Sequence, residues 1–248
     1  VIVAGVGLAG KFAGIYNVVV AVFGAVAGIM ISQYLGQKNR DEVKRSYYLN
    51  LVFALTFAGV FTFGCMLFPK KIMGLYTTDM QTQEAAARYL LILSGTFLPM
   101  AGATLLATLF RCTEKACYPL YASVCAALAN TVLNYILIFG KLGFAPMGME
   151  GAAIATVISQ SLALVAVLLL FSRKSELLHL RRGIYKLKAS IVRQTLAIGM
   201  SPFLMNACSC LVVLLLNRSM QEYGGDDALA AYGKVNRVAF VFFMVGMG

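Results

Sequence analysis

The sequence predicts an all-α membrane protein that crosses the bilayer several times. The chain is 60% hydrophobic and only 12% charged, which is about half the charged fraction of a typical soluble domain. Apolar runs long enough to cross the ~30 Å hydrocarbon core of a bilayer recur along the chain, and the basic residues lie between them. Because one soluble core cannot bury so many apolar side chains, most must face lipid or other apolar helices.

Seven apolar stretches are long enough to form transmembrane helices. They lie at about 12–36, 47–68, 86–110, 118–140, 148–171, 195–217 and 229–248. Pro99 lies in the middle of the third stretch and Pro202 in the first third of the sixth. Because proline has no backbone N–H, each predicts a kink or a broken hydrogen-bond ladder, and we expect both to act as conformational hinges.

The connections between these stretches alternate in charge. Thirteen Lys and Arg residues fall in 37–46, 111–117 and 172–194, whereas only four fall in the other three connections. The positive-inside rule therefore places these three basic connections in the cytoplasm. The bases do not form one continuous patch, so we expect no nucleic-acid partner.

The long basic connection suggests a division into two helix bundles. We expect 1–171 to be most of an N-terminal lobe, 172–194 a cytoplasmic linker between lobes, and 195–248 the start of a C-terminal lobe. The linker mixes leucines with bases, which suits an interfacial amphipathic helix and equally a solvated linker lying on anionic lipid. Both chain ends lie in apolar runs and the first residue is not Met, so we expect a fragment of a longer protein.

Polar side chains inside the predicted spans are candidates for a cation or substrate cavity. They are Asn130, Asn134, Thr156, Gln33 and Asn206. Asn130 and Asn134 lie one helical turn apart on one face. Their oxygens could coordinate a dehydrated cation or bind a polar substrate, and the alternative is hydrogen bonding between helices alone.

Several kinds of chemistry have no sequence signature here. No Asp or Glu lies deep in a predicted span, so we expect any coupling acid to lie outside this chain. The motifs of hydrolases, nucleotide-binding loops and dinucleotide-binding folds are absent, so we expect no enzyme and no cofactor. With one histidine and no CxxC pair, we expect no metal site.

Six sequence blocks resemble the multidrug and toxic compound extrusion (MATE) transporter family. They are ISQYLGQKNRDEVKR (31–45), LFRCTEKACYP (109–119), NTVLNYILIFG (130–140), MGMEGAAIATVISQ (147–160), AIGMSPFLMNA (197–207) and YGGDDALAAYGKVNR (223–237). Their order and spacing resemble the family from its second helix to the start of its eighth. The last two blocks are most similar to the bacterial MepA-like branch.

The resemblance implies a twelve-helix, two-lobe bundle that rocks between inward- and outward-open states. It implies a multi-pass protein of the bacterial cytoplasmic membrane, an ion-coupled antiporter that exports drugs or organic cations in exchange for Na⁺ or H⁺. We expect it to be monomeric. The alternatives are a flippase for a lipid-linked precursor, which should have a strongly cationic cavity, and a non-transporting membrane scaffold.

The resemblance also assigns three residues to an N-lobe cation site. Family members with such a site carry an Asn, an Asp one turn later, and a Thr on the next helix. Asn130 and Thr156 match the Asn and the Thr, whereas Asn134 stands where the Asp often is. This position therefore carries no titratable charge, and the coupling ion is not identified by the sequence.

Overall fold

The computed structural model describes most of the chain as helices. The described residues are 2–74, 80–141, 146–174, 193–209, 211–213, 215–216, 219, 235, 238–239 and 242. The chain divides into two compact units, Val1–Gly199 and Met200–Gly248. Each unit is described separately below.

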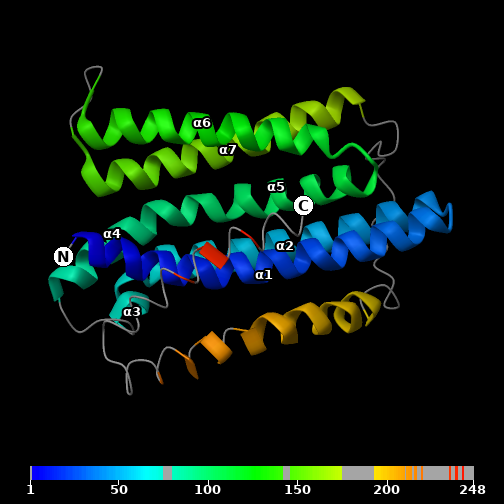
Figure 1. The fold of residues 1–248 in the computed structure, drawn as a ribbon, viewed down its shortest axis with the longest axis horizontal. Coiled ribbons are helices and arrows are strands. Elements are labelled where there is room, and N and C mark those ends of the chain that lie inside the picture. Colours follow the sequence, from blue (N-terminus) through cyan, green and yellow to red (C-terminus); the bar gives the residue numbers. More distant parts are fainter. Residues whose placement is uncertain are drawn as a thin grey trace. The chain divides into compact units, whose positions relative to one another are not determined.

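Seven labelled helices build the first unit (Figure 1). They are α1 (Ile2–Gly36), α2 (Arg40–Leu67), α3 (Pro69–Gly74), α4 (Met80–Leu93), α5 (Phe97–Cys112), α6 (Cys117–Phe139) and α7 (Gly148–Lys174). Only a single 3₁₀ turn, η1 (Ser94–Thr96), separates α4 from α5, so these two helices form one span. A further helix begins at Arg193 and continues past Gly199 into the second unit.

Six spans are long and apolar enough to cross a membrane, counting only the described residues. They are Gly5–Gly36, Arg40–Leu67, Met80–Cys112, Cys117–Phe139, Gly148–Phe171 and Arg193–Val213. The predicted all-α membrane fold is confirmed, and these spans correspond to the first six predicted stretches. The seventh predicted stretch and the 172–194 linker lie almost wholly outside the described residues.

The basic connections meet at one end of the first unit. The α1–α2 turn, the α5–α6 turn and the C-terminal end of α7 all lie at the right-hand end of Figure 1. The short α3 and the start of α4 lie at the opposite end. This is the arrangement that alternating basic connections predict for a membrane bundle.

An aromatic cluster fills the core between α1, α2 and α5. It contains Phe12 and Tyr16 of α1, Phe57 and Phe61 of α2, and Phe97 of α5. Tyr16 is 0% exposed, and its ring centroid lies 4.3 Å from that of Phe97. Its hydroxyl also donates a hydrogen bond to the Phe97 carbonyl oxygen at 2.5 Å. The cluster therefore fixes α1 against the point where the α4–α5 span changes helix type.

That change of helix type lies beside Pro99, where the sequence predicts a break. Pro99 sits in the first turn of α5, directly after the 3₁₀ turn. Backbone N–H groups in a first turn have no partner within their own helix, so a proline is tolerated there. The regular ladder is interrupted as predicted, while a hinge function for Pro99 stays a prediction.

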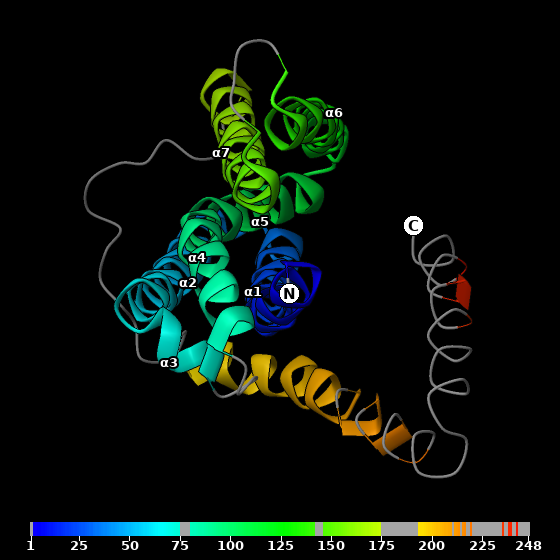
Figure 2. The same cartoon turned by 90° about the vertical axis from the view of Figure 1, so that its left-hand side faces the viewer.

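The helices α6 and α7 form a pair beside the remaining helices, as the end-on view shows (Figure 2). Gly140 ends α6 in a left-handed conformation, with φ of 66°, and a Cβ there would lie 2.6 Å from the Pro146 nitrogen. The turn that starts the hairpin therefore requires glycine. Leu120, Val124 and Leu128 are exposed at four-residue spacing on α6, as expected for a face toward lipid or further apolar helices.

Candidate functional site

A continuous set of hydrogen bonds joins α6 to α7 through the predicted asparagine pair. Asn134 Nδ2 donates to Asn130 Oδ1 at 2.9 Å, and Asn130 Nδ2 donates to Ser159 Oγ at 3.0 Å. Ser159 Oγ in turn donates to the Thr156 carbonyl oxygen at 3.0 Å. We call Asn130, Asn134, Thr156 and Ser159 the asparagine network. It links the two spans by hydrogen bonds between polar side chains.

One acceptor in the asparagine network has no partner. Asn134 Oδ1 is buried and accepts no hydrogen bond from any described residue. Leaving a buried acceptor unpaired costs about 1–3 kcal/mol, and more where no water is present to compensate. The network therefore presents an oxygen that a cation or a donor group on a substrate could satisfy.

Thr156 takes part in the network through its backbone. Its hydroxyl donates to the Ala152 carbonyl oxygen of its own helix at 2.9 Å, so only the oxygen lone pairs remain to contact a ligand. The side-chain oxygen that accepts the hydrogen bond from Asn130 is instead that of Ser159, which is 3% exposed. Ser159 was not among the predicted site residues. The sequence could have indicated Ser159, because it lies three residues after Thr156 and so shares a face of the helix with it.

Gln33 lies in a different place from the asparagine network. It lines an open groove of about 840 Å³ between α1 and α5. The groove is lined by Ala21, Gly24, Ala25, Gly28, Ile29, Ser32, Gln33, Thr104, Thr108, Arg111 and Cys112. None of the network residues is among them, and Arg111 is the one charged residue in this lining.

Small residues let α1 approach α5 along this groove. A Cβ on Gly24 would lie 3.3 Å from Thr104 Cγ2, and one on Gly28 would lie 3.3 Å from Thr108 Cγ2. The two threonine hydroxyls donate to carbonyl oxygens of α5 itself. The glycines thus allow close packing of the kind common in membrane helices.

Asn206 and Pro202 belong to the second unit, Met200–Gly248. Asn206 Nδ2 donates to the Pro202 carbonyl oxygen at 2.8 Å, one turn earlier in the same helix. Pro202 has no N–H to donate to the carbonyl oxygen of Ile198. The helix therefore lacks one backbone hydrogen bond near the boundary between the two units.

Replacing Pro202 with alanine should restore that hydrogen bond and stiffen the helix. We expect Pro202→Ala in the full-length protein to lower the rate of transport more than it lowers the yield of folded protein. The measurement is the efflux rate divided by the amount of protein in the membrane. Pro119→Ala is the matched control, since Pro119 lies in the first turn of α6, where proline replaces no helical hydrogen bond. Unchanged turnover in Pro202→Ala would reject a hinge at this position.

The described carboxylates lie at or near helix ends. Asp41 and Glu42 lie in the first turn of α2, and Glu150 lies in the first turn of α7. Among the described residues, no group of three or more His, Cys, Asp or Glu side chains comes together. The ligand atoms that the asparagine network offers are therefore neutral amide, hydroxyl and carbonyl oxygens.

Comparisons with known proteins agree with this architecture. The MatE family model matches residues 1–136, more than half of the chain. The "Probable multidrug resistance protein NorM" of Thermotoga maritima is 25% identical over 245 residues, which are 98% of this chain and 52% of that protein. The "Multidrug export protein MepA" of Staphylococcus haemolyticus is 28% identical over 219 residues, or 85% of this chain and 46% of that protein.

Solved structures show the same fold. The crystal structure of MATE in the bent conformation superposes with a TM-score of 0.87 at 19% identity, covering 96% of this chain and 52% of that chain. The chain thus spans about half the length of the relatives that it matches. Members of the family are multi-pass transporters of the cytoplasmic membrane and not enzymes. On the family match over residues 1–136, with six apolar helices and a shared fold in agreement, this chain belongs to the MatE family.

Proposed function

We propose that the protein containing this chain is a secondary active antiporter working by alternating access. It exports drugs or organic cations across the cytoplasmic membrane in exchange for Na⁺ or H⁺. In this proposal residues 1–171 are most of the N-terminal lobe, 172–194 link the lobes, and 195–248 begin the C-terminal lobe. We propose that it works as a monomer.

The match of the MatE family model to residues 1–136 carries this proposal. The named relatives support it, since the Staphylococcus haemolyticus protein is called a multidrug export protein. The antiport mechanism and the coupling ion are inferences from the family. Within this chain, the support for these two inferences is the presence of polar side chains among apolar helices. Such side chains are costly in a membrane and often mark transport pathways.

We assign the asparagine network to the N-lobe cation or substrate site. Asn130 and Thr156 resemble the Asn and the Thr of family members with such a site, and the unpartnered Asn134 Oδ1 supplies an acceptor. Neutral oxygens can replace part of the hydration shell of Na⁺, but an asparagine does not take up a proton near neutral pH. If the coupling ion is H⁺, the acid that carries it must therefore lie on residues other than these.

The direct test uses the full-length gene in cells that lack their own exporters. Ethidium efflux should be faster than in cells with an empty vector, and it should respond to an imposed Na⁺ or pH gradient. Efflux equal to the empty-vector rate under both gradients would count strongly against the proposal. Asn130→Leu should reduce efflux, because it removes the donor to Ser159 and the acceptor for Asn134 together.

Replacing Asn134 with aspartate should make transport depend on pH. The variant adds a titratable carboxyl beside the Asn130 amide, and its ionised form changes the charge of the site. We expect an added inflection in the pH profile of efflux that the parent protein lacks. Asn134→Leu is the control, because it has nearly the same size and does not titrate, so it should lower efflux evenly across pH. An Asn134→Asp profile parallel to the parent's would mean that Asn134 only packs.

One observation favours a second candidate, a flippase for a lipid-linked precursor. Arg111 is the single charge in the lining of the α1–α5 groove, and no acid lies there. A cationic groove suits an anionic headgroup better than an organic cation. Accumulation of a lipid-linked oligosaccharide after deletion of the gene, with unchanged ethidium efflux, would favour this candidate over the exporter.

A further inference from the structure

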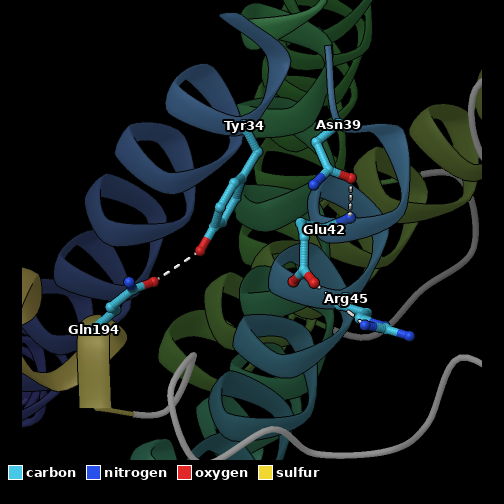
Figure 3. Close-up of polar contacts among 5 residues, drawn as sticks. All are labelled: Tyr34, Asn39, Glu42, Arg45 and Gln194. Carbon is cyan, nitrogen blue, oxygen red and sulfur yellow. Dashed lines mark hydrogen bonds and ion pairs between the residues drawn. The ribbon is translucent and has the colours of Figure 1, made fainter. Parts of the chain in front are cut away.

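The first turns of the helix that begins at Arg193 rest on one face of α1. The Tyr34 hydroxyl donates to Gln194 Oε1 at 2.7 Å, as Figure 3 shows. The Thr195 hydroxyl donates to Met30 Sδ at 3.2 Å. Residues 26, 30 and 34 recur every fourth position, so they share a face of α1. All of these contacts lie within the first unit.

The third contact is a close approach that depends on glycine. A Cβ on Gly199 would lie 3.1 Å from Val26 Cγ2, closer than ordinary side-chain contacts. As the partner on α1 moves from residue 34 to residue 26, the contacting residue advances from 194 to 199. The two segments therefore run antiparallel, and glycine permits their closest approach at the end of the contact.

This contact has a small apolar cluster of its own. Val26, Met30 and Leu49 are buried together, and Val22, Tyr34 and Ile198 pack against them. The main core, which contains Tyr16 and Phe97, is a separate and much larger cluster. Because little apolar surface holds residues 193–199 on α1, this contact can open without disturbing the main core.

Two buried oxygen atoms beside the cluster have no partner among the described residues while the contact is closed. Asn50 Nδ2 donates to the Ser46 carbonyl oxygen at 2.9 Å, and it lies 4.0 Å from Met30 Sδ. Asn50 Oδ1 and Ser46 Oγ are buried without a partner among the described residues. Water that enters on opening would satisfy these groups, which offsets part of the apolar burial that opening loses. Opening therefore costs less free energy than the loss of apolar burial alone.

The α1 side of the contact is held firmly. Just after Tyr34, the chain turns into α2, and the Asn39 amide donates to the Tyr34 carbonyl oxygen at 3.1 Å. Asn39 Oδ1 caps α2 by accepting from the Glu42 amide, and Glu42 pairs with Arg45 at 3.2 Å (Figure 3). On the other side, Pro202 weakens the helix three residues after Gly199. The firm side is thus α1, and the side able to move is the segment that leads into the second unit.

We propose that Gln194, Thr195 and Gly199 form a releasable latch on α1. The latch holds the start of the helix that begins at Arg193 on α1, and it opens and closes as this segment moves relative to α1 during transport. Tyr34 and Met30 are the α1 residues that the latch engages. This assignment goes beyond the proposed antiport function, because it concerns which contact opens and not what is transported.

The test measures the accessibility of Thr195, which is only 6% exposed when the latch is closed. Thr195→Cys is made in the full-length protein with its native cysteines replaced, and its labelling by a membrane-impermeant maleimide is timed in inside-out vesicles. Adding Gly199→Val should wedge the segment away from Val26 and speed labelling several-fold. Adding Tyr34→Phe, which removes only a hydroxyl, should speed labelling roughly two- to twelvefold, the range expected from one net hydrogen bond.

Two controls separate the latch from general loosening. Gly64→Val places the same side chain on α2, where a Cβ meets no atom within 4 Å, and it should leave labelling unchanged. Val26→Ala combined with Gly199→Val should return labelling toward the parent rate, because it frees the space that the new side chain needs. The latch is overturned if Gly64→Val accelerates labelling as much as Gly199→Val, or if Tyr34→Phe leaves the rate unchanged. Labelling does not depend on the transported substrate, so a failed efflux assay would not alter this result.

Discussion

Replacing Gly151 with leucine will separate α6 from α7 and cause a large loss of stability. A Cβ on Gly151 would lie 2.9 Å from the Leu137 carbonyl oxygen and 3.0 Å from the Leu137 carbonyl carbon. These are backbone atoms of α6, which cannot rotate away as a flexible side chain can. Overpacking usually costs about 1–3 kcal/mol, and we expect a loss of about 3 kcal/mol or more because whole helices must move. The measurement is the melting temperature of the purified full-length protein in detergent.

Gly59→Leu provides the matched control for this experiment. Gly59 lies within α2, and a Cβ there meets no atom within 4 Å. Both variants replace a helical glycine with leucine, so the difference between them reports mainly the α6–α7 contact. Equal melting temperatures for the two variants would mean that the close approach at Gly151 does not hold the pair together. Separation of the pair should also break the Asn130–Ser159 hydrogen bond and with it the asparagine network.

Most of the transmembrane helices could be predicted because an apolar run is a local property of the sequence. The length of an apolar run is set by the thickness of the bilayer, and it can be read directly from the residues. Helices α1 and α2 begin at Ile2 and Arg40, before their predicted stretches at 12–36 and 47–68. Likewise, α4 begins at Met80 although the apolar stretch was placed at 86–110. Its polar first turn is stabilised from outside the helix, since Gln83 Nε2 donates to the Lys70 carbonyl oxygen at 2.7 Å. The hydropathy of the sequence does not reveal a contact of this kind between α3 and α4.

The candidate site could be predicted only in part, for a similar reason. A four-residue spacing puts Asn130 and Asn134 on one face of α6, and their side chains hydrogen-bond to each other there. Their partner Ser159 depends on how α7 is rotated about its axis, which an apolar helix with little amphipathic pattern does not specify. Gln33 was grouped with them, yet it lines the α1–α5 groove. Tertiary neighbours of this kind depend on packing between spans.

Replacing Tyr16 with alanine should be the most damaging change in the core. Tyr16 is fully buried against Phe57, Phe61 and Phe97. Removal of a large buried aromatic side chain usually costs about 3–5 kcal/mol, because it forfeits packing and leaves a cavity. The cavity would open beside the 3₁₀ turn before α5, where the helical ladder is already interrupted. We expect a sharp fall in melting temperature and in the yield of monodisperse protein.

Tyr16→Phe separates packing from hydrogen bonding at the same position. It keeps the ring and removes only the hydroxyl that donates to the Phe97 carbonyl oxygen, so it should cost about 1 kcal/mol. Tyr121→Ala on α6 is the control for tyrosine loss, since Tyr121 is 65% exposed, and it should cost little. If Tyr16→Phe were as damaging as Tyr16→Ala, the hydrogen bond would hold α1 at the helix break. The expected order, with alanine far worse than phenylalanine, would instead mean that aromatic packing holds α1 there.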